Sequence, residues 1–239
     1  MNIILLTSNE LRHLYFAKRI CEVLDVKLII SEAKNNFSKD LHEKEKNYFK
    51  NIINWPSIEN HLFLESGEIN NVSVELKLKQ LSPDYIFTFG CGLLKPSIFN
   101  IPRYGCINIH TGLVQYYRGV DSTMWAIIDN RLDLIGSTIH YIDNSIDGGD
   151  IIDQRKIDLL ELSSSDTLDD VFIKNCIIGI ELLIENIDNI LSKKIYLKKD
   201  KATGKLYQNK DKNKESLLRA ESNLRNYFNK INDFNKTKV

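Results

Sequence analysis

The first part of the chain alternates short apolar runs with an amphipathic stretch, which is the pattern of a β-α-β unit. Residues 2–7 and 26–31 are apolar runs, and residues 10–24 carry apolar side chains near helical spacing. This order predicts parallel strands joined by right-handed crossovers. The polar and charged residues 32–58 predict a helix or a mobile excursion over the edge of that sheet.

The middle of the chain continues the alternation of strands and helices. We expect strands at residues 61–66, 84–90, 105–110, 134–142 and 151–157, and helices at 69–81 and 121–129. A long apolar stripe at 163–192 predicts a long helix, capped near Ser165 or Asp166. The pattern predicts an α/β fold, with a Rossmann-like, mostly parallel sheet and flanking helices.

The composition changes after Leu191. Residues 193–239 contain 14 Lys and Arg against 5 Asp and Glu. Their spacing predicts a hairpin that turns near Thr203 and Gly204, followed by an amphipathic helix. We therefore divide the chain into a main domain at 1–192 and a basic C-terminal extension at 193–239. This extension can be a solvated face, a subunit interface or a rim that binds an anionic substrate, and the sequence leaves all three interpretations open.

The overall composition gives little information about the class of function. The 32 basic and 32 acidic side chains balance, so net charge does not indicate a nucleic-acid or membrane partner. No apolar run approaches the roughly 18 residues of a membrane span, and the start does not resemble a secretory signal. The four cysteines form no CxxC pair, so we expect free thiols in a cytoplasmic protein and no metal site.

Three polar elements follow predicted strands: the glycine-containing loop 89–96, the pair Asn108 and His110, and the turn 143–150 with Asp147. Ligands of open parallel sheets bind beyond the carboxyl ends of strands, so these elements can meet in one pocket. An Asn amide can donate to a developing oxyanion, a His can exchange protons near neutral pH, and an Asp can orient the imidazole. Because no activated Ser or Cys accompanies them, the set suits direct attack of an amine on a carbonyl. Taken singly, each motif is more often structural.

Together these motifs resemble one family. The stretch "FGCGLLKPSIFNIPRYGCINIHTGLVQYYRG", with "IGSTIHYID" and "IDGGDII" after it, resembles the formyltransferases that use N10-formyltetrahydrofolate. The resemblance implies that Asn108 and His110 stabilise a tetrahedral intermediate while Asp147 assists proton removal. It also implies a folate co-substrate site built from Phe89, Gly90, Cys91, Gly92, Leu93, Leu94, Ile142 and Asp143.

The acceptor is indicated less directly. Residues 111–115 read "TGLVQ", where the family commonly has Pro-Ser-Leu-Leu-Pro, so we expect a looser loop there. The N-terminal loop lacks the glycines of the glycinamide-ribonucleotide enzymes, and the tail is shorter than the C-terminal barrel of the methionyl-tRNA enzymes. The chain is most similar to the amino-sugar N-formyltransferases, which implies a dTDP- or UDP-linked amino deoxysugar and a role in surface polysaccharide synthesis.

Further expectations follow from this resemblance. Arg118, Ser8 and Asn9 are candidates for contact with the acceptor, and a homodimer without nucleic-acid or membrane partners is expected. Formyl transfer to glycinamide ribonucleotide or methionyl-tRNA, and hydrolysis of the formyl folate, stay open as alternatives.

Overall fold

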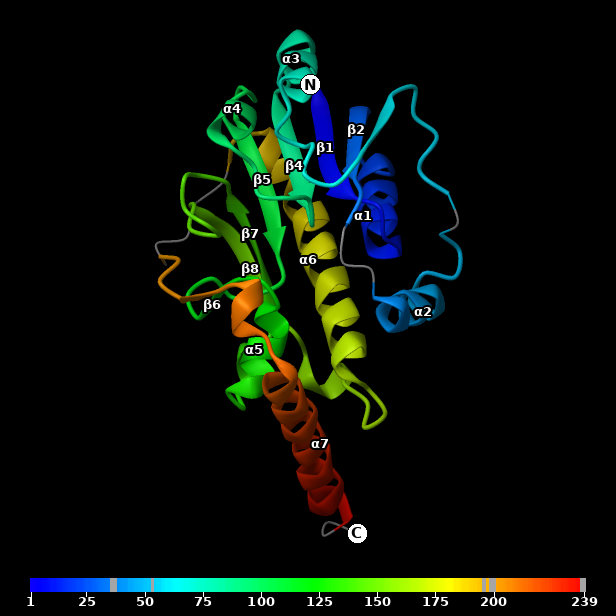
Figure 1. Cartoon of the computed structure of the whole chain (residues 1–239), viewed down its shortest axis with the longest axis vertical. Helices are drawn as coiled ribbons and strands as arrows, with labels where there is room; N and C mark the ends of the chain where they lie inside the picture. Colours follow the sequence, from blue (N-terminus) through cyan, green and yellow to red (C-terminus); the bar gives the residue numbers. More distant parts are fainter. Residues whose placement is uncertain (35–37, 53, 195–196, 198–200, 237–239) are drawn as a thin grey trace.

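A seven-stranded sheet forms the centre of the molecule (Figure 1). The computed structural model describes residues 1–34, 38–52, 54–194, 197 and 201–236. The strands lie in the order β3-β2-β1-β4-β5-β7-β8. Their bounds are β1 (Ile3–Ser8), β2 (Val26–Glu32), β3 (His61–Leu64), β4 (Tyr85–Phe89), β5 (Gly105–His110), β7 (Gly136–Tyr141) and β8 (Ile151–Lys156). The strands from β3 to β5 pair in parallel, whereas β7 and β8 are antiparallel to their neighbours, so the predicted mostly parallel α/β sheet is confirmed.

Helices cover both faces of this sheet. One face packs against α1 (Leu11–Cys21) and α6 (Leu168–Leu191), and the other against α3 (Val72–Leu81) and α4 (Pro96–Phe99). In β1, Ile3 and Leu5 belong to the first core and Ile4 and Leu6 to the second. Side chains alternate across a strand, so a strand buried on both faces is apolar throughout, which is why its sequence is a continuous run.

The charged stretch after β2 contains the packed helix α2 (Lys39–Tyr48). Glu45 of this helix is buried and pairs with Arg12 of α1, and the Lys44 ammonium lies 2.6 Å from a carboxylate oxygen of Asp170 in α6. The helical reading of this stretch is therefore correct over these residues. Residues 35–37 and 53 lie outside the described part of the chain.

The C-terminal extension differs from the prediction. A short strand, β9 (Lys205–Tyr207), pairs in parallel with β6 (Tyr117–Gly119), a strand that the sequence pattern did not predict. The expected first strand of the hairpin falls partly on 195–196 and 198–200, outside the described residues. The amides of Gly204 and Lys205 instead donate to carbonyls of the loop before β6, which explains why no hairpin is needed to pair this strand.

The remaining helices lie beside one end of the sheet. Helix α5 (Ser122–Ile128) packs against α7 (Lys214–Lys236), whose Ala220, Leu224 and Phe228 are buried. Figure 1 shows α7 extending away from the sheet, with the C-terminus at its far end. Short 3-10 turns lie at Leu132–Leu134, Leu159–Glu161 and Asn209–Asp211. Of the helices in the described residues, none is long and apolar enough to cross a membrane.

Helix α6 begins at Leu168, one residue later than an Asp166 cap would place it. Thr167 is the N-cap: its hydroxyl accepts the Asp170 amide at 3.4 Å, and the Asp170 carboxylate accepts the Thr167 amide at 2.8 Å. Ser165 and Asp166 instead bond within a turn with Ser163, and Asp166 also pairs with Lys174. The side chains of Ser165 and Asp166 are thus engaged in hydrogen bonds of the preceding turn and do not cap the helix.

Replacing this cap gives a direct test of the assignment. Thr167→Ala removes the reciprocal capping interaction, and we expect the free energy of unfolding to fall by about 1 kcal/mol. Ser165→Ala, in the neighbouring turn, should change it by less than about 0.5 kcal/mol because exposed substitutions away from caps have small effects. Urea unfolding followed by circular dichroism measures both. A larger loss in Ser165→Ala would return the cap to the position that the sequence pattern suggested.

Candidate active site

Asn108 and His110 project from the same face of β5. Ile107 precedes Asn108 in the strand, and Ile109 lies between Asn108 and His110. Both isoleucines belong to the core under α6. Successive side chains alternate, so Asn108 and His110 lie on the opposite face. The antiparallel pairing with β7 places His140 across from Asn108 and Thr138 across from His110. This face of the β5–β7 pair therefore carries two histidines and one amide.

The amide of Asn108 is held in one orientation by its neighbours. The Thr88 hydroxyl donates to Asn108 Oδ1 at 2.8 Å, and Asn108 Nδ2 lies 3.2 Å from His140 Nε2. His140 Nδ1 lies 2.8 Å from the Tyr141 carbonyl oxygen, which can only accept, so Nδ1 carries the proton. Burial lowers the pKa of His140 below its ordinary value and keeps the ring neutral, so Nε2 accepts from Asn108. This chain of bonds uses one amide hydrogen of Asn108 and leaves the other for a ligand.

The His110 ring is held from both sides. Its Nε2 lies 3.1 Å from the Tyr117 carbonyl oxygen and 3.1 Å from the Ser122 hydroxyl. The carbonyl can only accept, so we place a proton on Nε2. Nδ1 faces a carboxylate oxygen of Asp147 at 3.4 Å. A proton that reaches Nδ1 therefore meets a negative charge, which suits a group that exchanges protons.

Asp147 completes the cluster from a turn that returns along the sheet. Because β7 is antiparallel, it ends near the start of β5, where the Ile142 amide donates to the Cys106 carbonyl at 2.8 Å. The turn then bends back, with Asp147 in the left-handed region at a φ of 49°. One Asp147 oxygen accepts the Gly119 amide at 2.7 Å, and the other lies 3.7 Å from His140 Nε2. Asn108, His110 and Asp147 are thus brought together, although the turn does not follow a parallel strand as expected.

The loop after β4 approaches the same cluster. The Thr7 hydroxyl donates to the Phe89 carbonyl at 2.7 Å, and the Gly92 amide donates to the Glu32 carboxylate at 3.1 Å. Gly90 has a φ of 70°, and a side chain there would collide with the His13 ring. These contacts fix the backbone of the loop against the ends of β1 and β2. The loop follows Thr88 directly, so it lies beside Asn108.

The side chains proposed for the folate site fall into two groups. Leu94 and Ile142 pack in the same apolar cluster, whereas Leu93 is 72% exposed. Burial raises the pKa of the Cys91 thiol to about 12, so this cysteine stays protonated. Asp143 is exposed, and its carboxylate accepts from the amide and hydroxyl of Ser145. The structure brings Leu94 and Ile142 together, and Asp143 shapes the turn that carries Asp147.

The three residues expected on the acceptor side do not form one group. The buried Ser8 hydroxyl donates to the Glu32 carbonyl at 2.7 Å, while Asn9 beside it is exposed. The Arg118 guanidinium donates to the Ala202 carbonyl at 2.8 Å, in the C-terminal extension. Arg118 is therefore engaged by the tail, an arrangement that its Arg-Gly motif did not indicate.

The loop at 111–117 is anchored despite its missing prolines. The side chains of Gln115 and Gln154 exchange amide hydrogen bonds, and Gln154 also donates to the Thr138 hydroxyl at 2.8 Å. The Thr138 hydroxyl donates in turn to the Gly112 carbonyl at 2.6 Å. These contacts restrain the loop at positions where the family has prolines.

Sequence reasoning missed His140, Thr88, Ser122 and Gly119. The motif "IGSTIHYID" contains His140, but only the register between β5 and β7 places it against Asn108. Thr88 is likewise the register partner of Asn108 in β4. A strand-pairing signal could have found both residues, whereas a search for short motifs could not.

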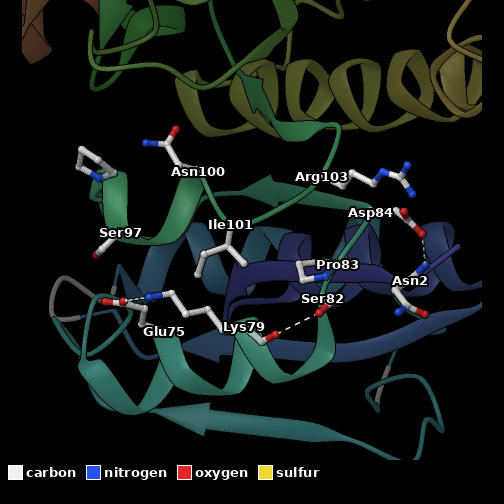
Figure 2. Close-up of a pocket in the computed structure, with 11 residues that line it drawn as sticks. Asn2, Glu75, Lys79, Ser82, Pro83, Asp84, Ser97, Asn100, Ile101 and Arg103 are labelled. Carbon is white, nitrogen blue, oxygen red and sulfur yellow. Dashed lines mark hydrogen bonds and ion pairs between the residues drawn. The ribbon is translucent and has the colours of Figure 1, made fainter.

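An open cavity of about 600 Å³ lies at the other end of the sheet (Figure 2). Asn2 and Asp84, which precede β1 and β4, line it together with Lys79 of α3 and Arg103 before β5. Figure 2 shows the side chains of Lys79 and Glu75 in contact at its rim. It contains none of the clustered polar groups around Asn108, so cavity size alone would misplace the site.

Comparisons with known proteins show the family to which the sequence is related. A family model described as formyl transferase matches residues 1–176. A methionyl-tRNA formyltransferase from Kosmotoga olearia is 36% identical over 155 residues, which cover 64% of this chain and 49% of that protein. The chain spans about half the length, or less, of the curated relatives that it matches.

Solved structures match more of the chain. A 4-N formyltransferase from Francisella tularensis is 27% identical, with a TM-score of 0.62, and the match covers 88% of this chain and 77% of that one. An N-formyltransferase from Helicobacter canadensis, solved with folinic acid and dTDP-3-aminofucose, shares the fold at 18% identity and a TM-score of 0.61. That match covers 94% of this chain and 81% of the other.

The protonation state of His140 gives a testable consequence. Its lowered pKa means that the unfolded chain binds a proton below about pH 6.5 that the folded protein does not, so stability falls as pH drops through that window. We expect nitrogen NMR of the ring to show the neutral Nδ1–H form at pH 6.

The matched variant is His140→Gln, which cannot titrate. Its loss of unfolding free energy from pH 7 to pH 5 should be smaller than that of the wild type, by up to about 1.4 kcal/mol per pH unit. Equal pH dependence in the two proteins, or a charged ring at pH 6, would contradict the hydrogen-bond assignment around Asn108.

Proposed function

This chain belongs to the formyl transferase family, and we propose that it transfers a formyl group from N10-formyltetrahydrofolate to the amine of a dTDP- or UDP-linked amino deoxysugar. The observation that carries the proposal is the cluster of Asn108, His110 and Asp147 beside the loop after β4. An oriented amide, a proton-exchanging ring and a carboxylate are the groups that direct acyl transfer to an amine requires.

The oxyanion is the first charge that the site must stabilise. The amine nitrogen attacks the formyl carbon, and the carbonyl oxygen takes the electron pair of its double bond. Asn108 offers an amide hydrogen whose direction is fixed by Thr88 and His140. A preorganised donor of this kind lowers the barrier by about 2.7–4 kcal/mol in acyl transfer. His110 adds a second donor only once Nδ1 has gained a proton, because its Nε2 hydrogen is engaged by the Tyr117 carbonyl.

Proton movement then completes the reaction. The attacking nitrogen loses one proton, the bond from the formyl carbon to N10 of the folate breaks, and N10 gains one proton. Asp147 is the proposed acceptor for the proton of the amine, because its carboxylate faces Nδ1 of His110 at 3.4 Å. Asp147 passes this proton to Nδ1 of His110, and His110 delivers it to the leaving nitrogen, so the proton that the amine loses is the one that N10 gains.

The folate side is assigned to the loop after β4. Its backbone is fixed at Phe89 and Gly92, and Leu94 and Ile142 offer an apolar surface for a flat ring. The loop lies beside Asn108 because Thr88, the residue before the loop, donates a hydrogen bond to the Asn108 side chain. This position suits a co-substrate whose formyl group must reach the Asn108 amide. Phe89, Gly90, Cys91, Gly92, Leu93 and Asp143 are proposed as the remaining folate contacts.

Two observations bear on the acceptor. The fold shared with an N-formyltransferase solved with dTDP-3-aminofucose, over 94% of this chain, supports an amino sugar. The curated relatives are methionyl-tRNA formyltransferases, and this favours a tRNA acceptor as the second candidate. We favour the amino sugar because the structural match extends over more of the chain than residues 1–176.

An acceptor panel separates these candidates. The full chain and N10-formyltetrahydrofolate are incubated with dTDP- and UDP-linked 3-amino and 4-amino deoxysugars, with methionyl-tRNA, or with glycinamide ribonucleotide. We expect a mass gain of one formyl group on an amino sugar and none on its hydroxyl analogue, which lacks the nucleophile. Formylation of methionyl-tRNA alone would contradict the sugar proposal, and release of formate without an acceptor would indicate a hydrolase.

A further inference from the structure

The segment Ala202–Tyr207, which we call the strap, lies outside residues 1–176 of the family match. It runs along the loop 113–120, which joins β5 to α5 and includes β6. The strap pairs with β6 in a two-stranded sheet that is separate from the seven-stranded one. Its contacts are therefore with the loop that carries β6 rather than with the central sheet.

Hydrogen bonds join the strap to the loop along its whole length. The Gly204 amide donates to the Val114 carbonyl at 3.0 Å, and the Lys205 amide to the Tyr116 carbonyl at 3.1 Å. At the far end, the Val120 amide donates to the Tyr207 carbonyl at 3.0 Å. The Arg118 guanidinium adds its bond to the Ala202 carbonyl. The strap thus satisfies polar groups of the loop that would otherwise need water.

Two glycines permit this close approach. A Cβ at Gly204 would lie 2.5 Å from the Tyr116 carbonyl carbon, and one at Gly119 would collide with the Tyr207 carbonyl. Gly119 also has a φ of 82°, which side chains rarely adopt. The fit between strap and loop therefore depends on the absence of side chains at these positions.

Aromatic packing anchors the end of the strap. The Tyr207 ring stacks on Trp125 of α5, with centroids 4.2 Å apart and an interplanar angle of 14°. Both rings are buried in the cluster that includes Leu224 and Phe228 of α7. Just beyond the strap, the Lys212 ammonium lies 2.6 Å from the carboxylate of Asp121. Contacts of α5 and α7 thus fix Tyr207 in place.

We propose that the strap positions the acceptor half of the active site by holding Gly119 where its amide bonds Asp147. Gly119 is the register partner of Tyr207, and its amide donates to the Asp147 carboxylate at 2.7 Å. The Tyr117 carbonyl, also on β6, is the partner of His110 Nε2. Both catalytic groups therefore take part of their orientation from β6, and β6 takes its position from the strap. Tyr207 and Gly204 are positioning residues in this account.

The kinetic part of this inference rests on the proposed function, but its structural part does not. Loosening the strap should disturb Gly119, Asp147 and His110 and leave the bonds from Thr88 to Asn108 in place. The folate loop is fixed by β1 and β2, so its affinity for folate should not change. We therefore expect kcat to fall while the KM for the folate stays nearly unchanged.

The test uses two disruptive variants and two controls of the full chain. Tyr207→Ala removes the anchor, and Gly204→Ala pushes the strap from the loop without removing an aromatic ring. Tyr207→Phe keeps the stacked ring, and Leu218→Ala changes an exposed residue of α7. Hydrogen exchange by mass spectrometry reports on residues 117–121 and on β1 and β4, and steady-state kinetics report on transfer.

We expect both disruptive variants to exchange faster at 117–121, with β1 and β4 unchanged. Their kcat should fall about tenfold or more, the value of a lost hydrogen bond to a charged group, with the KM for the folate within about twofold. Tyr207→Phe and Leu218→Ala should match the wild type. Unchanged exchange at 117–121, faster exchange throughout the sheet, or an unchanged kcat despite a loosened loop would each overturn the proposal. If the wild type formylates no acceptor, the proposed function fails, and hydrogen exchange alone decides whether the strap holds Gly119.

Discussion

The antiparallel pairing of β7 with β5 is the constraint on which the site depends. A parallel neighbour would place a different residue beside Asn108 and would end at the same edge as β5, so the turn after it would not run back along the face. The observed register puts His140 opposite Asn108, and it returns the following turn along the face so that Asp147 reaches His110. Orientation of the amide, the ring and the carboxylate therefore follows from one change of strand direction.

The two histidines of the site have different chemical tasks. His140 is buried and neutral, donates to a carbonyl through Nδ1, and accepts the Asn108 amide through Nε2. His110 faces a carboxylate through Nδ1 and a carbonyl through Nε2. A fixed acceptor and a proton-exchanging ring lie on one face of the sheet, and their surroundings separate their roles.

The site is also divided between two supports. The loop after β4 is held by the ends of β1 and β2, while the loop before α5 is held by Gln154 and by the C-terminal strap. The first support belongs to the part of the chain that the family model matches, whereas the strap lies beyond it. The second support can therefore vary without any change in Asn108, His110 or Asp147.

Local patterns in the sequence predicted the central strands and singled out three residues that the structure brings together. Apolar runs mark β1, β2 and β4 because these strands are buried on both faces. The role of His140 and the pairing of β6 with β9 could not be predicted, because both depend on contacts between residues distant in the sequence. The cap of α6 is Thr167, the residue after the two that the sequence indicated, because Ser165 and Asp166 have the right chemistry but bond within their own turn.

Asp147→Asn tests the central claim most directly, because the amide keeps the size of the side chain and an acceptor for Gly119 while removing the carboxylate. The measurement is the single-turnover rate of formyl transfer to the accepted amine, with Asp150→Asn, at an exposed position after the turn, as the matched control. We expect Asp147→Asn to lose at least about a hundredfold in rate, the lower range for a positioned acid or base, at unchanged thermal stability. Transfer at the wild-type rate by Asp147→Asn would contradict the account.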